Sequence, residues 1–171
     1  MTGAEVQIPK GTYPLLVTQH EIAGHPTRAE HWNFVVFIDQ DDYEVHELEG
    51  NYDTFEYLPK TKFGLGKTPD FRGGCLVGFL RPEQITPRRR IGNKQPDSPL
   101  VQWLRSVDVI KGTQAFDCQN WVVHSLVVLR EQGVTLPGVN EKMIREELER
   151  EKERDEYGQD LIHERILAAK A

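Results

Sequence analysis

The first half of the chain has the apolar patterning of a β-sheet. One run, 31–39, HWNFVVFID, is apolar on both faces, which is typical of a strand covered on both sides. A polar turn follows, and the next run, 43–50, alternates, so the two runs predict a hairpin whose first strand is central in its sheet. A glycine-rich loop is predicted over 64–74. The predicted strands are 12–21, 31–39, 43–50, 54–63 and 75–82.

A proline-rich segment, 82–99, separates these strands from the helices of the second half. We expect a long loop here, with one helical turn near its start. It carries an arginine cluster at 88–90, for which a solvated loop is a better interpretation than an entrance for an anionic group. A short helix is predicted over 98–107, with Ser98 as N-cap and Pro99 at the first helical position.

A longer helix is predicted from Asp117 to Gln132. At 100° per residue, Cys118 shares a face with the apolar side chains, so it starts a buried helix and points inward. Gly133 ends the helix. Beyond residue 138 the chain becomes mostly charged, and an apolar segment near its end is predicted to dock on the domain or on another subunit. The apolar residues of that segment are Leu161, Ile162, Ile166 and Leu167.

Together these elements predict an α+β fold in two parts. An antiparallel sheet packed against the cysteine-bearing helix forms one domain, residues 1–138, and a charged helical tail follows over residues 139–171. A length of 171 residues with 38% hydrophobic content suits a single domain with its own core. We therefore expect one globular unit with an attached tail.

Charge and local composition disfavour several classes of protein. The net charge of −6 argues against nucleic-acid binding, which needs an excess of lysine and arginine on one face. The start of the chain does not resemble a secretory signal, and no apolar run approaches the roughly 20 residues of a membrane span. We expect a cytoplasmic protein whose two cysteines, Cys75 and Cys118, are free thiols, with Cys75 in the core.

Two further motifs carry no function in this interpretation. The histidines of HEIAGH, His20 and His25, are five residues apart instead of four, which places them on different helix faces, and a glycine and a proline disfavour a helix there. FGLGKT, residues 63–68, ends like a phosphate-binding loop, but Thr61 occupies the position of the first glycine and a proline follows. We predict neither a metal site nor a cofactor.

Cys118 is the residue whose position suggests chemistry. A thiol attacks as the thiolate, and a helix N-terminus favours that form through its partial positive charge and unpaired N–H groups. The backbone amide of Cys118 could also hold an oxyanion. Asp117 precedes it, and a carboxylate beside a thiolate opposes the helix dipole. Buried free cysteine is also common as a small hydrophobic residue, so position alone leaves both interpretations open.

A nucleophilic cysteine needs a base within hydrogen-bond reach, and the chain offers six histidines. His124 rotates to the far side of the cysteine helix, and His163 lies in the charged tail. His31 opens the central strand and His46 lies in its hairpin neighbour, so both could project toward the start of the helix. Each of them alone is also compatible with a structural histidine.

The segments around these residues resemble a known family. HWNFVVFIDQDDYEVHEL has His-Trp, alternating apolar residues, an acidic turn and then aromatic-x-Val-His-x-Leu. DCQNWVVHSLVVLREQG places two polar residues, an aromatic and an aliphatic after the cysteine, with a glycine closing the helix. Both are similar to motifs of the lecithin retinol acyltransferase-like group of permuted NlpC/papain-like thiol hydrolases and acyltransferases. The order His, His, Cys is also the permuted order.

The resemblance implies a permuted papain-like fold with a Cys-His-His triad. Cys118 would be the nucleophile, His31 the base that takes its proton, and His46 the polar third member that orients His31. Gln119 and Trp32 are the candidate oxyanion or substrate-binding residues. The aspartate before the cysteine stands where the family usually has asparagine, and the charged tail stands in place of the family's membrane-anchoring segment.

Two hypotheses about function follow. The first is a soluble cysteine hydrolase or acyltransferase that acts on an amide, ester or thioester of a small-molecule, peptide or acyl substrate through an acyl-cysteine intermediate. The second is a non-enzymatic adaptor on the same fold, which uses the charged tail to bind a partner or another copy of itself. A metal site built from the histidines is disfavoured, because no pair has ligand spacing on a regular element.

Overall fold

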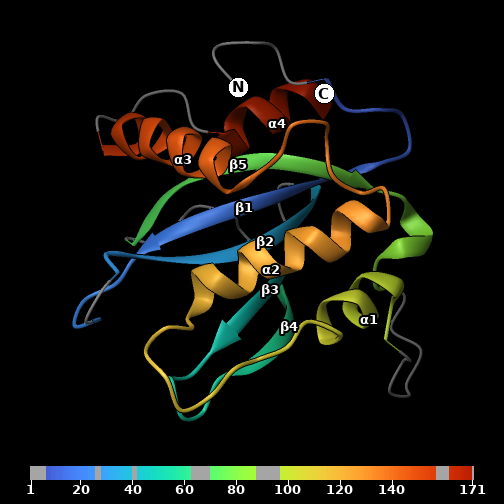
Figure 1. Ribbon diagram of the computed structural model, residues 1–171. Coiled ribbons are helices and arrows are strands. Elements are labelled where there is room, and N and C mark those ends of the chain that lie inside the picture. Colours follow the sequence, from blue (N-terminus) through green and yellow to red (C-terminus); the bar gives the residue numbers. More distant parts are fainter. Residues whose placement is uncertain are drawn as a thin grey trace.

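The computed structural model describes residues 7–25, 28–39, 42–62, 70–87, 97–156 and 162–170. In this part of the chain, five antiparallel strands form one curved sheet with helices packed against it, as Figure 1 shows. The α+β class predicted from the sequence is therefore confirmed. The strands are β1 (Tyr13–Glu21), β2 (Glu30–Asp39), β3 (Asp42–Glu49), β4 (Glu56–Lys62) and β5 (Phe71–Leu80). The helices are α1 (Pro99–Arg105), α2 (Cys118–Glu131), α3 (Glu141–Glu156) and α4 (Ile162–Lys170), and a 3₁₀ turn, η1, spans Pro82–Gln84.

The strand order is β4-β3-β2-β1-β5, so β2 is the central strand and pairs with β3 as the predicted hairpin. Its side chains are buried on both faces because helices cover both. Phe34 and Val36 belong to the larger core, which also contains the apolar residues of α2, whereas Val35 and Phe37 belong to a second core with Ile166 of α4. The continuous apolar run of the sequence thus reflects a strand buried on both sides.

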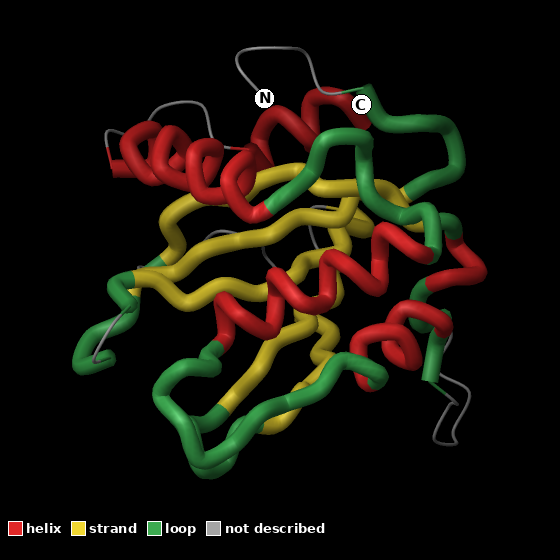
Figure 2. Tube along the Cα trace, in the orientation of Figure 1, coloured by secondary structure: helices red, strands yellow, loops and turns green. Residues whose placement is uncertain are grey.

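Helix α2 crosses one face of the sheet, as the red tube in front of the yellow strands in Figure 2 shows. Its anchor is Trp121, which is fully buried and packs edge-on against Phe34 at 5.8 Å and in a stacked arrangement against Tyr57 at 5.3 Å between ring centroids. Aromatic pairs of this geometry stabilise a core beyond the area they bury. Gly133, with φ of 73°, adopts the left-handed conformation that ends the helix.

Strand β5 begins at Phe71, four residues before the strand start predicted at Cys75. Gly73 and Gly74, which the sequence suggested were loop, are strand residues because another helix crosses them closely. A Cβ atom at Gly73 would lie 2.7 Å from Cβ of Glu151 in α3, and Gly73 has φ of 102°. Here glycine provides a close approach between strand and helix and does not mark a turn.

The short helix α1 begins as predicted. Ser98 is its N-cap and accepts a hydrogen bond from the amide of Val101 at 3.3 Å, and Pro99 takes the first helical position. The arginine cluster at 88–90 and the FGLGKT segment at 63–68 lie outside the described residues.

The charged tail forms two helices that pack against the sheet. On α3, Ile144 and Leu148 are almost fully buried and join the larger core, which also contains Cys75 and Val77 of β5. On α4, Ile162 and Ile166 are buried in the second core, with Leu167 packed against it, while Leu161 lies outside the described residues. The apolar residues of the tail therefore dock within the same chain. Among the described helices, none combines the length and apolar composition needed to cross a membrane.

The docking of α3 can be tested by truncating its anchor. We predict that Ile144→Ala lowers the free energy of unfolding by about 2–5 kcal/mol, because it leaves a cavity between α3 and β5. Lys142→Ala is the matched control, since the Lys142 side chain is 86% exposed, and it should change stability by no more than about 0.5 kcal/mol. Urea denaturation measures both. Equal effects of the two substitutions would contradict the docked position of α3.

Candidate active site

A cavity of about 640 Å³ opens where the start of α2 meets β2, β3 and the β1–β2 loop. Apolar groups and a few polar groups share its lining, as in many small-molecule sites. The lining residues are Ile22, Ala23, Gly24, His25, His31, Glu47, Leu48, Glu49, Gly50, Asn51, Tyr52, Phe55, Gln114, Phe116, Asp117 and Cys118.

Cys118 is the first residue of α2, and its side chain faces this cavity from a position that is only 4% exposed. The helix begins here because Asp117 has an extended backbone and caps it: its carboxylate accepts hydrogen bonds from the amides of Gln119 at 3.0 Å and Asn120 at 3.1 Å. The Asn120 side chain in turn accepts from the Asp117 amide at 3.0 Å. This reciprocal capping box fixes the direction of the first turn and therefore the position of the thiol.

His31, at the start of β2, lines the same cavity as Cys118, and interaction with Cys118 contributes to the pKa of His31. Its Nε2 atom lies 3.3 Å from Oε2 of Glu47, so the carboxylate engages this ring nitrogen. Burial disfavours the charged imidazole, but the hydrogen bonds to Cys118 and Glu47 outweigh burial and raise the pKa of His31 to about 9. The geometry thus stabilises an imidazolium beside the thiol.

Glu47 of β3 holds the far side of the His31 ring. Its carboxylate also accepts from Nζ of Lys60 at 2.9 Å and from the Asn33 amide group at 3.4 Å. Burial alone would raise the pKa of Glu47, but the hydrogen bonds and charges of His31 and Lys60 lower it to about 2. Glu47 is therefore ionised at neutral pH, and its charge fixes the orientation of His31.

His46 does not occupy the place that the sequence suggested. Its Nδ1 atom lies 2.6 Å from the Tyr57 hydroxyl and its Nε2 atom lies 3.0 Å from Oε2 of Glu44, so both ring nitrogens are engaged there. The side chain is 1% exposed and is absent from the cavity lining. The prediction that His46 orients His31 does not match these contacts, because His46 pairs with Phe34 on the face of the hairpin that carries the larger core.

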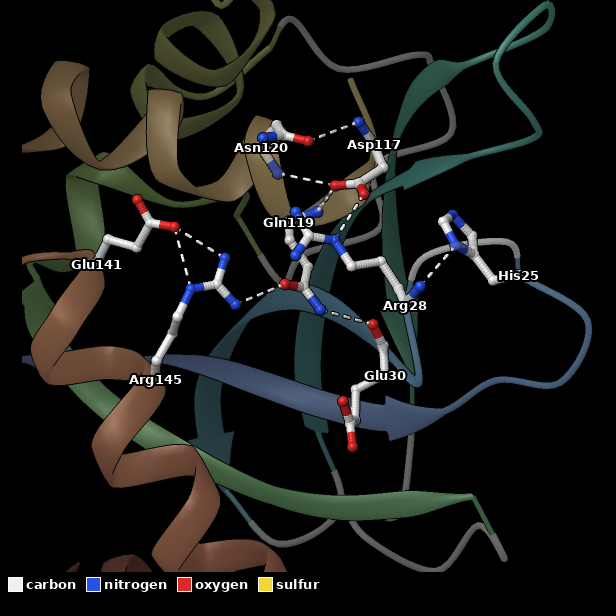
Figure 3. Close-up of polar contacts among 8 residues, drawn as sticks. All are labelled: His25, Arg28, Glu30, Asp117, Gln119, Asn120, Glu141 and Arg145. Atoms are coloured by element: carbon white, nitrogen blue, oxygen red, sulfur yellow. Dashed lines mark hydrogen bonds and ion pairs between the residues drawn. The ribbon is translucent and has the colours of Figure 1, made fainter. Parts of the chain in front are cut away.

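Gln119 and Trp32, the predicted oxyanion or substrate-binding residues, are buried and lie outside the cavity lining. Figure 3 shows Gln119 held between two partners: its Nε2 donates to the Glu30 carbonyl at 2.9 Å, and its Oε1 accepts from Arg145 of α3 at 2.8 Å. The Arg145 guanidinium also lies over the Trp32 ring, 4.5 Å from its centroid. These contacts attach α3 to the start of α2, so Gln119 and Trp32 contribute to the packing of the helices and do not line the cavity.

The remaining cysteine and histidines have other surroundings. Cys75 is a free, buried thiol, as predicted, and burial raises the pKa of Cys75 to about 12. His124 packs against Phe116, and His163 of α4 packs against Phe71. Among the described residues, no group of three or more histidine, cysteine, aspartate or glutamate side chains is arranged to hold a metal ion.

Comparison with known proteins adds no assignment, since no family model, curated protein or solved structure matches the chain.

The contact between Glu47 and His31 makes a prediction about titration. Glu47→Gln should lower the pKa of His31 from about 9, because the amide no longer stabilises the imidazolium. NMR titration of the imidazole signals measures this change, with Glu44→Gln as the control, because Glu44 contacts His46 instead. An unchanged His31 titration in Glu47→Gln would contradict the assigned contact.

The same contact affects stability as the pH changes. The pKa of His31 is higher in the folded protein than its ordinary value of 6.5, so its contribution is fully present below pH 6.5 and is lost as the pH rises toward 9. The Glu47→Gln variant should lose less stability over that pH window than the wild type, which urea denaturation at several pH values measures.

Proposed function

We propose that this protein is a cysteine-dependent hydrolase or acyltransferase in which Cys118 is the nucleophile, His31 the base and Glu47 the residue that orients His31. The observation that carries the proposal is that these three side chains line one cavity, where His31 lies 3.3 Å from the Glu47 carboxylate and both Glu47 and Cys118 raise the pKa of His31. A nucleophile beside a base, which is itself oriented by a third group, is the general arrangement for covalent catalysis. The resemblance of the two sequence segments to permuted papain-like enzymes supports the same chemistry, and the proposal includes that fold assignment.

The proposed reaction proceeds through a thioester. The proton of Cys118 resides on His31 in a thiolate–imidazolium pair, which the raised pKa of His31 favours, and Sγ attacks the carbonyl carbon of the substrate as the thiolate, so a carbon–sulfur bond forms and the carbonyl oxygen takes the negative charge. The tetrahedral intermediate collapses as the bond to the leaving group breaks, and His31 returns its proton to the departing amine, alcohol or thiol. Water or another nucleophile then attacks the acyl-cysteine. His31 takes the proton of that acceptor and passes it back to the sulfur as the thioester breaks.

The oxyanion of this intermediate would be held by the backbone amide of Cys118. Asp117 caps the helix through the amides of Gln119 and Asn120, which are the next two in the turn, so the cap does not use the amide of Cys118 itself. This amide points along the helix axis at the end where the helix dipole is positive, and both features favour a developing negative charge.

The cavity favours an uncharged substrate. Its described lining contains apolar side chains, among them Phe55 and Phe116, and contains neither lysine nor arginine. The imidazolium of His31 in this lining is already paired with Glu47, and the carboxylates of Glu47 and Asp117 would repel an anionic group such as a phosphate. A screen of amide, ester and thioester substrates identifies the bond attacked.

The adaptor hypothesis has less support from the structure. It was motivated by the length of the tail as one continuous helix and by its sparse apolar residues. The described tail instead forms two helices, α3 and α4, whose residues Ile144, Leu148, Ile162 and Ile166 are buried against the sheet of the same chain. Self-association through the tail would have to use its charged outer surface. That association stays a prediction, and sedimentation measures it.

Alkylation by iodoacetamide tests the proposed nucleophile without a known substrate. We predict that iodoacetamide labels Cys118, and that His31→Ala slows this labelling about tenfold or more at pH 7, because the imidazolium no longer stabilises the thiolate. Cys75 is the internal control, since burial and its raised pKa should keep it unlabelled, and mass spectrometry separates the two thiols. Slow labelling of Cys118 that does not depend on His31 would contradict the proposal.

A further inference from the structure

The first turn of α2 presents an electrostatic conflict. Asp117 provides the helix cap, but it directly precedes the proposed nucleophile and lines the same cavity, and a negative charge near the sulfur disfavours the thiolate. The Asp117 side chain is only 5% exposed, so water screens this charge poorly. An uncompensated carboxylate at this position would oppose the chemistry of Cys118.

The structure contains a countercharge for it. Nε of Arg28, from the loop between β1 and β2, donates to Oδ2 of Asp117 at 2.8 Å, while the other carboxylate oxygen serves the helix cap. Figure 3 shows the Arg28 side chain reaching from its loop to the Asp117 carboxylate. The two functions of the carboxylate are thus divided between its two oxygens.

The same arginine belongs to a loop that forms a wall of the cavity. The Arg28 amide donates to Nδ1 of His25 at 3.0 Å, and the Ile22 amide donates to the Ala29 carbonyl at 2.9 Å, which closes the loop. Ile22 and His25 both line the cavity. Since the Arg28 side chain reaches across to Asp117, one ion pair joins this wall to the turn that carries Cys118.

The other charged groups around the start of α2 have partners of their own. Glu47 on β3 is paired with His31 of β2 and with Lys60 of β4. On α3, Arg145 is paired with Glu141 and its remaining donor contacts the neutral Gln119. These pairings leave Arg28 as the cation placed to offset Asp117 in the described part of the site.

We propose that Arg28 is a positioning residue for the proposed reaction: it neutralises the Asp117 carboxylate beside Cys118 and holds the β1–β2 loop against the first turn of α2. This inference rests on the proposed function. It also gives a reason why aspartate can stand before the cysteine. The carboxylate supplies a strong helix cap, and Arg28 removes the effect of its charge on the sulfur.

The test is a double-mutant cycle read by the pH dependence of Cys118 alkylation with iodoacetamide. Arg28→Gln should move the labelling profile about half to one unit toward higher pH, which corresponds to labelling about threefold to tenfold slower at pH 7, because Asp117 loses its countercharge. Adding Asp117→Asn should return the rate to within about twofold of the wild type. Asparagine removes the charge but caps a helix as well as aspartate does.

The single variant Asp117→Asn makes the cycle informative even if Arg28→Gln fails to fold. It leaves the Arg28 cation unpaired near the sulfur, so the profile should move toward lower pH. Arg81→Gln is the matched control for lost positive charge, because Arg81 lies outside the cavity lining and its side chain is 64% exposed. It should leave the profile unchanged.

Different outcomes overturn different statements. A His31-dependent thiol in the wild type, with no shift in Arg28→Gln, overturns the role of Arg28 and leaves the proposed function standing. A shift that Asp117→Asn does not reverse shows that Arg28 acts by holding the loop alone, which contradicts the neutralisation. If the alkylation rate of Cys118 does not depend on His31, the proposed function is wrong, and the role of Arg28 is wrong with it.

Discussion

The pairing register of β2 with β3 determines which side chains the candidate site contains. Phe34 pairs with His46, so odd-numbered residues of one strand share a face with odd-numbered residues of the other. His31 and Glu47 therefore point to one face of the hairpin, and His46 points to the opposite face. A shift by one residue would exchange these faces and bring His46, not Glu47, to the side of His31. The proposed base and its carboxylate partner thus depend on a single alignment of two strands.

The position of the thiol depends in turn on how firmly α2 is fixed to that sheet. Trp121 anchors the helix one turn after Cys118, between Phe34 of β2 and Tyr57 of β4. Side-chain contacts hold the first turn from two directions: Arg28 reaches Asp117 from the β1–β2 loop, and Arg145 reaches Gln119 from α3. The tail is therefore part of the support of the candidate site, since α3 contacts the residue that follows the cysteine.

Much of this arrangement follows from patterns in the sequence. The helix cap at Ser98, the central strand and its hairpin, and the α+β class could be predicted because capping residues and apolar runs act locally. The candidate thiol and base could also be named, because one opens an amphipathic helix and the other opens a strand. The early start of β5 could not be predicted, because Gly73 lies in a strand only where a helix that is distant in the sequence crosses it.

Glu47, the third residue of the candidate site, could not be predicted from the sequence, and the cause is physical. Both faces of β2 are apolar, so alternation does not reveal which face carries the site, and the relative phase of β2 and β3 depends on the turn between them. The sequence favoured His46 for this role because it is a histidine, whereas Glu47 has the pattern of an ordinary surface carboxylate. The position of Glu47 in the alternation of β3 could have indicated it. Glu47 lies on the opposite face from His46 and on the same face as Tyr43 and Val45, which pair with Phe37 and Val35.

The separation of Cys118 from His31 in the sequence has a consequence for the chain during its synthesis, before it is folded. The ribosome makes β2 and β3 early and α2 much later, with β4, β5 and α1 between them. Until α2 docks, no imidazole is held beside the sulfur, and the nascent thiol has the modest reactivity of a free cysteine in solution. In the proposed mechanism, an acylating nucleophile therefore first exists in a molecule that already has a cavity around it. The proposed mechanism would thereby keep the growing polypeptide from being acylated before the cavity exists.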